Sequence, residues 1–351
     1  MIKEDKMPPS RVLILVWGGI GNMVMALPML NAASRGFPGG VLTVVVQNAT
    51  MLSLLEGNDR FVKLTMDSKE FSGAFGKLKL IKKIKKQLPE VTISTVPSPK
   101  IRSGILAILS GSGIRICSSQ YGSHFFNIKV EGKTEQKHYV YRNLGLLKPL
   151  EIESDSVEYG IRVPLKYDKE AEEFIKNGNI SSNKIIGFHP GAGNRQKRWP
   201  VEKFVAIGKD LTSRGCQVII FGGTEEAELV KKVAAGIGPG GFRFIGNNDL
   251  NSTLALINKC QIFLSNDSGL AHCAAALGVS TVVVFGPTDP NICAPEAQNI
   301  RLIRNNIDCG PCYRPANKYK CNYYPPMCLE IPTDRVLMEV CELMESSEDV
   351  R

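Results

Sequence analysis

Residue types that bind anions gather after an apolar run in the segment HPGAGNRQKRWP, residues 189–200. Gly191 and Gly193 allow successive backbone N–H groups to turn toward an anion. Lys197 and Arg198 add positive charge just before a predicted helix, whose N-terminus attracts negative charge. The pattern favours a site for a diphosphate group. The alternative is an ordinary strand-to-helix connection that carries solvated cations.

Two further polar segments follow apolar runs in the second half. In FGGTEEAE, residues 221–228, Glu225 or Glu226 either stabilises a helix N-terminus or accepts the hydroxyls of a ribose. In SNDSGLAHCAAALG, residues 265–278, a strand ends and a helix begins whose first N–H groups have no partner within the helix. Its candidate ligand-binding residues are Asp267, Ser268, Gly269, Leu270 and His272.

Each residue of this segment also has an interpretation without a ligand. Asp267 or Ser268 can serve as the N-cap of the helix, and His272 can pack against the sheet. Capping and ligand binding are compatible. A further segment, FGPTDP, residues 285–290, contains two prolines that fix a turn at the same strand ends.

The first half has one comparable segment, GGIGNM, residues 18–23. Gly18, Gly19 and Gly21 form a turn between a predicted strand and a predicted helix. Asn22 stands where a catalytic carboxylate would be the natural choice, and a neutral amide does not act as a general base. Alternatively, Asn22 is the N-cap of the helix. The segment lacks the G-x-G-x-x-G pattern, which argues against a dinucleotide-binding dehydrogenase.

Strands and helices alternate in both halves of the chain. With their loops, strands are predicted at residues 11–17, 41–47, 91–97, 114–118, 184–193, 216–223, 242–246, 261–269 and 280–290. Helices are predicted at residues 22–35, 76–88, 102–113, 201–215, 224–238, 250–260 and 269–278. This alternation predicts an α/β fold with doubly wound parallel sheets, which bind ligands at the carboxyl ends of their strands.

The length of 351 residues predicts two domains. We expect an N-terminal domain at residues 1–165 and a C-terminal domain at residues 183–330, with a polar boundary region between them. A terminal helix and tail occupy residues 331–351. The cleft between two such domains is the expected ligand site.

The chain is basic, with a formal net charge of +9. Part of the excess lies in GKLKLIKKIKKQL, residues 76–88, where Leu78, Ile81, Ile84 and Leu88 recur at helical spacing. The lysines on the other face either are simply solvated or meet anionic lipid or an acidic acceptor. No aromatic residues alternate with these lysines, so nucleic acid is not expected as a partner.

The N-terminal segment is polar and does not have the pattern of a signal peptide, and no apolar run is long enough to span a membrane. A cytoplasmic protein is expected.

In order and spacing, the segments GGIGNMVMALPML, HPGAGNRQKRWP, FGGTEEAE, SNDSGLAHCAAALG and FGPTDP resemble the ADP-heptose:lipopolysaccharide heptosyltransferases, glycosyltransferase family 9. The resemblance covers most of the chain and implies a GT-B architecture, with two Rossmann-like domains facing across a cleft. The N-terminal domain would lie on the acceptor side and the C-terminal domain would bind the nucleotide sugar. The implied activity is an inverting, metal-independent sugar transfer that needs no cofactor.

The implied donor is a nucleotide sugar, with ADP-heptose favoured, and the implied acceptor is the lipopolysaccharide core or a related glycan. The implied location is the inner face of the inner membrane, with peripheral contact. Lys197 would neutralise the donor diphosphate, and Glu226 or Glu225 would bind the nucleoside. The residues that would surround the sugar and phosphates are Asp267, Ser268, Gly269, Leu270 and His272.

The chain departs from the family at Asn22, where members usually carry the Asp that is the proposed general base. Three interpretations are open. Another residue serves as base, with Asp267, His124 and His138 as candidates. Alternatively, the reaction tolerates a weak base because departure of the phosphate carries most of the barrier. In the third, the protein binds a nucleotide sugar without transferring it.

Four of the ten cysteines lie close together late in the chain, at Cys309, Cys312, Cys321 and Cys328. Four thiols that begin with a C-x-x-C pair have a spacing that suits a structural zinc ion. Free thiols and disulfides are the alternatives, and disulfides are not expected in the cytoplasm.

Overall fold

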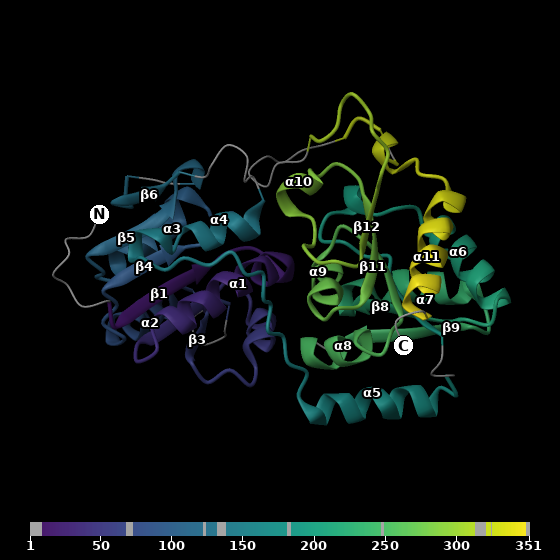
Figure 1. Cartoon of the computed structure of the whole chain (residues 1–351), viewed down its shortest axis with the longest axis horizontal. Coiled ribbons are helices and arrows are strands. Elements are labelled where there is room, and N and C mark those ends of the chain that lie inside the picture. Colours follow the sequence, from purple (N-terminus) through teal and green to yellow (C-terminus); the bar gives the residue numbers. More distant parts are fainter. Residues whose placement is uncertain are drawn as a thin grey trace. The chain divides into compact units, whose positions relative to one another are not determined.

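The computed structural model describes residues 9–67, 73–121, 124–131, 138–180, 184–246, 249–312, 321–323 and 325–348. The chain divides between Arg162 and Val163 into two compact units. Each unit contains a parallel six-stranded sheet with helices packed on it (Figure 1). Within the described ranges, every helix is too short or too polar to cross a membrane.

The sheet of the first unit contains β1 (Arg11–Val16), β2 (Val41–Val46), β3 (Phe61–Thr65), β4 (Val91–Ser94), β5 (Ile114–Ser118) and β6 (Ile128–Val130). Its helices are α1 (Ile20–Gly36), α2 (Gly73–Lys86), α3 (Lys100–Leu109) and α4 (Tyr139–Gly145). The strand order is β3-β2-β1-β4-β5-β6. Strands β1 to β3 follow one another toward one edge of the sheet, and strands β4 to β6 toward the other edge. The strand order therefore reverses between β1 and β4, and a doubly wound sheet opens a crevice for a ligand at such a point.

In the second unit the strands are β7 (Ile185–His189), β8 (Gln217–Gly223), β9 (Gly241–Gly246), β10 (Ile262–Asn266), β11 (Ser280–Phe285) and β12 (Ile300–Arg304). Its helices are α5 (Leu165–Asn177), α6 (Val201–Ser213), α7 (Ala227–Ile237), α8 (Leu250–Ile257), α9 (Gly269–Ala276), α10 (Pro290–Cys293) and α11 (Thr333–Glu348). The strand order β12-β11-β10-β7-β8-β9 repeats that of the first unit, with the reversal between β7 and β10.

Alternate residues of the second sheet enter two separate cores. Ile186 and Phe188 of β7 pack with α6, α7 and α11, whereas Ile185 packs with α5, α8 and α9. This two-residue period follows from the alternating direction of side chains along a strand. Because helices cover both faces, the central strands β7, β10 and β11 are mostly apolar, and their polar residues lie near the strand ends.

The predicted doubly wound sheets are confirmed, with three strands that the sequence analysis omitted. These are β3 and β6, the two outer strands of the first sheet, and β12, one of the two outer strands of the second, and all three are more polar than the central strands. Residues inside the predicted boundary region form α5, which packs along α8 in the second unit (Figure 1).

The predicted apolar face of the lysine-rich helix is only partly confirmed. Leu80 and Ile84 pack beneath α2 against Leu13 and Leu15, but Leu78 and Leu88 are exposed. Ile84 is therefore buried as predicted and Ile81 is half-buried, but Leu80 takes the place predicted for Leu78, and large apolar side chains are left in solvent.

Candidate functional site

The candidate site of the second unit lies at the carboxyl ends of β7 and β10, the neighbouring strands between which the order reverses. The segment after β7 carries Gly191, Gly193 and Lys197, and the segment after β10 carries Asp267 and Ser268. Loops at this point of a doubly wound sheet diverge and leave a crevice for a ligand. The topology therefore brings these predicted residues to one edge of the sheet.

An ion pair joins the two loops. Lys197 Nζ donates to Asp267 Oδ2 at 2.8 Å, and the side chains are only 16% and 6% exposed. Thr288, from the FGPTDP segment, also donates its hydroxyl to Asp267 Oδ2. Asp267 therefore holds the ammonium group of Lys197, a donor-only cation, in place at the ends of β7 and β10.

Asn266 fixes the loop that carries Lys197. Its side chain is fully buried, accepts the backbone N–H of Trp199 at 2.9 Å, and donates to the carbonyl of Pro190 at 2.8 Å. One amide thus ties both ends of the loop to the last residue of β10. Asn266 was not predicted as a site residue, although a polar residue at the end of an apolar strand was the available signal.

Glu226 is turned into the site by three partners. Its carboxylate lies 3.2 Å from His189 Nε2, accepts the backbone N–H of Gly223 at 3.3 Å and pairs with Arg198 at 3.4 Å. Burial alone would raise the pKa of Glu226, but the contacts with His189, Gly223 and Arg198 outweigh it and lower the pKa below its ordinary value. Glu226 is therefore held as a carboxylate able to accept hydroxyls.

His189, also not predicted as a site residue, connects Glu226 to the start of α9. Because a carboxylate only accepts hydrogen bonds, Nε2 of a neutral His189 carries the proton. Nδ1 then accepts the hydroxyl of Ser268 at 2.9 Å. Ser268 in turn is the N-cap of α9 and accepts the N–H of Ala271, so of the two predicted caps, Asp267 and Ser268, it is Ser268 that is confirmed.

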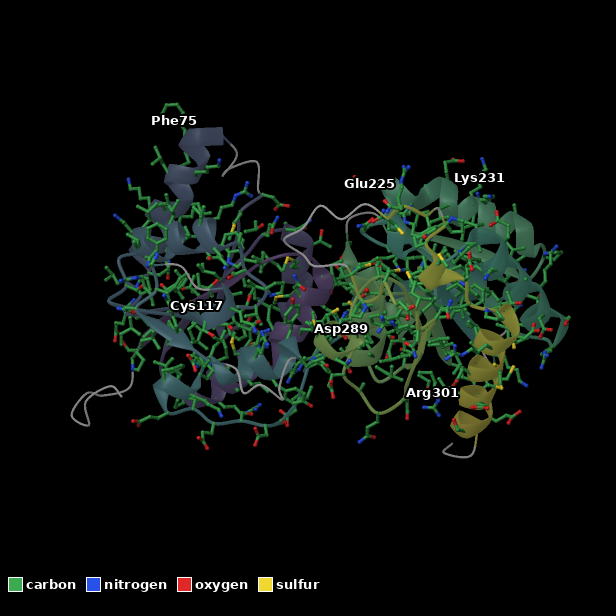
Figure 2. All side chains as sticks on the ribbon, turned by 90° about the horizontal axis from the view of Figure 1, so that it is seen from above. Phe75, Cys117, Glu225, Lys231, Asp289 and Arg301 are labelled. Atoms are coloured by element: carbon green, nitrogen blue, oxygen red, sulfur yellow. The ribbon has the colours of Figure 1, made fainter. Side chains whose placement is uncertain are left out.

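The other predicted donor-site residues differ in their placement. Gly191 is buried against Glu226, and a Cβ atom at this position would lie 2.0 Å from Glu226 Oε1, so a larger residue would displace the carboxylate from its present position. Gly193 is exposed, and His272 is buried in the first turn of α9. Glu225 is exposed, and Figure 2 shows it at the surface of the second unit. Gly269 and Leu270 are the first residues of α9.

The candidate loop of the first unit joins β1 to α1. Gly18 has a φ of +90°, which favours glycine, and its N–H donates to Gln47 Oε1 at 3.1 Å. The N-cap of α1 is Gly19, without a side-chain hydrogen bond, so the predicted capping role of Asn22 is wrong. Instead, Asn22 Nδ2 donates to the carbonyl of Trp17 at 3.2 Å and packs over Gly18. Gly21 lies in the first turn of α1.

The two histidines considered as alternative bases lie outside this loop. His138 is buried and caps α4, where its Nδ1 accepts the N–H of Val140 at 3.3 Å. His124 is exposed before β6.

Four late cysteines line one small cavity together with Gln196, Pro287, Ile307 and Met327; they are Cys309, Cys312, Cys321 and Cys328. The thiols are not disulfide-bonded. Within the described ranges, no three His, Cys, Asp or Glu side chains are grouped so that they would hold a metal ion. Structural zinc at these cysteines stays a prediction.

A family model described as glycosyltransferase family 9 (heptosyltransferase) matches residues 81–322. The chain is 32% identical to lipooligosaccharide heptosyltransferase 2 of Haemophilus ducreyi over 167 residues, which are 46% of this chain and 47% of that protein. It is 28% identical to lipooligosaccharide heptosyltransferase 2 of Campylobacter jejuni over 208 residues, 56% of this chain and 63% of that one. The chain thus matches about half of the length of these relatives.

Two solved structures share the fold over nearly the whole chain. The structure of E. coli ADP-heptose lps heptosyltransferase II has a TM-score of 0.76 and 22% identity, and covers 96% of this chain and 99% of that one. The family 9 glycosyl transferase of Veillonella parvula has a TM-score of 0.79 and 19% identity, over 96% and 98%. The predicted GT-B class, with two Rossmann-like units, is confirmed. Since the family model covers more than half of its residues, this chain belongs to glycosyltransferase family 9.

Proposed function

We propose that the protein transfers a heptose from ADP-heptose, or a closely related nucleotide sugar, to the core of lipopolysaccharide or a related glycan. The single observation that carries the proposal is the Lys197–Asp267 pair at the ends of β7 and β10, in a chain of this family. The relatives named above are heptosyltransferases, and another solved structure with a similar fold is that of E. coli heptosyltransferase WaaC with ADP.

In this proposal the donor diphosphate lies against Lys197 and the first turn of α9. A cation and backbone N–H groups stabilise the charge that develops on a leaving diphosphate, and both are preorganised here. Asp267 keeps the ammonium in position, and Ser268 fixes the start of the helix. This set of donors supports a transfer that needs no divalent cation.

Glu226 would accept the ribose hydroxyls of the donor. Its contacts with His189, Gly223 and Arg198 hold it ionised and orient it before any ligand arrives. A preoriented carboxylate loses little side-chain entropy when the ligand binds, which favours affinity. Glu225, which is exposed, has no comparable arrangement, so the nucleoside role is assigned to Glu226.

The reaction we propose is an inverting displacement, in which the acceptor hydroxyl attacks the anomeric carbon and the diphosphate leaves from the opposite face. The hydroxyl proton must go to a base, and Asn22 does not supply one. Asp267 is engaged by Lys197 and Thr288, and His138 is engaged as a helix cap. These contacts support the interpretation in which the reaction tolerates a weak base.

The first experiment is thermal stabilisation of the full chain by ADP, GDP, UDP and CDP, followed by a transfer assay with the matching heptose or hexose nucleotide. A nucleotide present at about 100 times its Kd adds about 2.7 kcal/mol to the folded state. We expect ADP to give the largest shift. If none of the four nucleotides shifts the unfolding temperature, the donor site proposed at Lys197 and Asp267 is refuted.

A second candidate function is that of a nucleotide-sugar-binding homologue with little or no transfer activity. Asn22 favours it, because the amide serves as a hydrogen-bond donor to Trp17 rather than as a base. The variant Asn22→Asp separates the two candidates. Raised transfer would show that only the base is missing, whereas unchanged or lower transfer would indicate another base or another geometry.

Asn31→Asp is the matched control for that variant. Asn31 lies on the same helix and its amide also donates to backbone carbonyls, those of Glu158 and Tyr159. It is therefore expected to report the structural cost of replacing an amide donor by a carboxylate. Only a change in transfer beyond that of Asn31→Asp reflects chemistry at position 22.

The proposed location is the cytoplasmic side of the inner membrane, in peripheral contact with it. This follows from the proposed acceptor, which is anchored in a membrane.

A further inference from the structure

The outer faces of α2 and α3 in the first unit leave large apolar side chains in solvent. Phe75 and Leu78 on α2 are 84% and 61% exposed, and Ile101 on α3 is 67% exposed. Ile105 and Ile108 continue the α3 stripe at helical spacing. Isolated exposed apolar residues are common, but a group on two neighbouring helices indicates an interaction surface.

Both helices lie on the same face of the sheet and touch one another. Leu80 and Ile84 of α2 and Leu106 of α3 pack in one core against Leu13 and Leu15 of β1. The outward faces of α2 and α3 are therefore adjacent. Figure 2 shows Phe75 standing out from the end of α2.

The charge of this surface has one sign. The segment of α2, GAFGKLKLIKKIKK, contains six lysines, and α3 adds Lys100 and Arg102. Neither helix contains Asp or Glu. Lys79, Lys82 and Lys86 are exposed, and Lys82 follows Leu78 by four residues, on the same side of the helix.

From this combination we propose that the α2–α3 face, defined by Phe75, Leu78, Lys79, Lys82, Lys86, Ile101, Ile105 and Ile108, docks on an anionic lipid bilayer. Apolar side chains that enter the boundary between headgroups and acyl chains, together with lysines that meet lipid phosphates, are the two components of interfacial binding. The lack of any acidic residue on either helix favours this occupant over a protein surface of mixed charge.

Co-sedimentation of the full chain with vesicles tests the proposal. One set contains phosphatidylcholine alone and the other contains phosphatidylcholine and phosphatidylglycerol in a two-to-one ratio. We expect binding to the second set and much weaker binding to the first. Binding should fall when salt shortens the Debye length from about 10 Å to about 3 Å. Because no donor or acceptor is present, the result does not depend on heptosyl transfer.

Two variants with matched controls locate the surface. Replacing Lys79, Lys82 and Lys86 by Gln is expected to lower the partition coefficient by about fivefold per lysine. The same replacement at three exposed lysines of the second unit, Lys169, Lys209 and Lys231, should leave it nearly unchanged. All six side chains are exposed, so folding should be preserved in both variants.

A second variant and its control test the apolar side chains of the surface. Leu78→Ser should reduce vesicle binding about tenfold, whereas Leu165→Ser, at a leucine that is 80% exposed in the second unit, should not. Equal binding by Leu78→Ser and wild type, or equal binding to neutral and anionic vesicles, would overturn the proposal. A third outcome would also overturn it: wild type binds neither kind of vesicle but forms a dimer in sedimentation velocity, and Leu78→Ser abolishes that dimer. The surface would then be a self-association face.

Discussion

Removing the ammonium of Lys197 should lower both the stability of the protein and its affinity for the nucleotide, and the two effects have different causes. In Lys197→Met, Asp267 keeps only the hydroxyl of Thr288 near the oxygen that now accepts Lys197 at 2.8 Å. The carboxylate is 6% exposed, so water replaces the lost partner poorly. Breaking a buried ion pair on one side costs about 3 kcal/mol, because an unpaired buried charge remains. For a unit of this size that lowers Tm by about 6–12 °C.

The same variant should lose a charge-assisted contact to the donor diphosphate. Such contacts are worth about 1.5–3 kcal/mol, so we expect ADP to bind roughly 10- to 100-fold more weakly. The double variant Lys197→Met with Asp267→Asn removes the unpaired charge as well as the cation. It should regain most of the lost stability while its affinity for ADP stays low.

Calorimetric unfolding and titration with ADP measure the two effects independently. Lys232→Met is the control, because Lys232 pairs with Glu202 at 3.0 Å but both side chains are mostly exposed. An exposed pair contributes less than about 1 kcal/mol. The reasoning is refuted if Lys197→Met unfolds at the wild-type temperature. It is also refuted if the double variant binds ADP as well as wild type, since Lys197 would then serve only as the counterion of Asp267.

Three other features give testable expectations. Asn266→Ala should destabilise the chain by about 2–5 kcal/mol in urea unfolding, because two buried backbone groups lose their partner; stability within about 0.5 kcal/mol of wild type would contradict this. Because the pKa of Glu226 is lowered from 4.5, its contribution is complete above that pH and is lost as the pH falls through the native pKa. The stability gap between wild type and Glu226→Gln should therefore be constant near neutral pH and shrink below about pH 4.5, and a gap that grows on acidification would oppose the assignment. Burial raises the pKa of Cys328 to about 11, so iodoacetamide followed by mass spectrometry should label it far more slowly than the exposed Cys309; protection of Cys309 that a chelator relieves would instead reveal a bound metal.

The candidate donor site was largely predictable because its signals are local. Gly191, Lys197 and Asp267 each follow a recognisable apolar strand, and parallel strands bring their carboxyl ends to one edge of the sheet. The alternation of strands and helices predicts a parallel sheet, but that β7 and β10 are neighbours comes from the structure. Ser268 was one of two candidates for the N-cap, and local sequence alone did not decide between them.

The residues that hold the site together were not predictable in the same way. Asn266 acts across 67 positions of sequence on Trp199, and His189 acts across 37 positions on Glu226. A single polar residue at a strand end gives no indication of its distant partner. The error on α2 has a different cause, because Leu78 and Ile84 both fit an apolar stripe and only the packing against β1 selects Ile84.

The function of Asn22 depends both on the local sequence and on the folded structure around it. Its identity is local, but its role depends on Gly18, whose positive φ turns the chain so that the carbonyl of Trp17 lies within 3.2 Å of the amide. A carboxylate in that position would face a carbonyl oxygen, and two acceptors repel one another. Asn22→Asp therefore must either turn its side chain away from Trp17 or take up a proton, and only the first arrangement provides a base. Turning the carboxylate away loses one hydrogen bond, which costs about 1 kcal/mol. A protonated carboxyl keeps a hydrogen bond to the carbonyl of Trp17, but taking up a proton near neutral pH also costs free energy, so a loss of stability does not by itself tell the two arrangements apart. The rate of transfer does, because it rises only when the carboxylate is ionised and free to reach the acceptor hydroxyl.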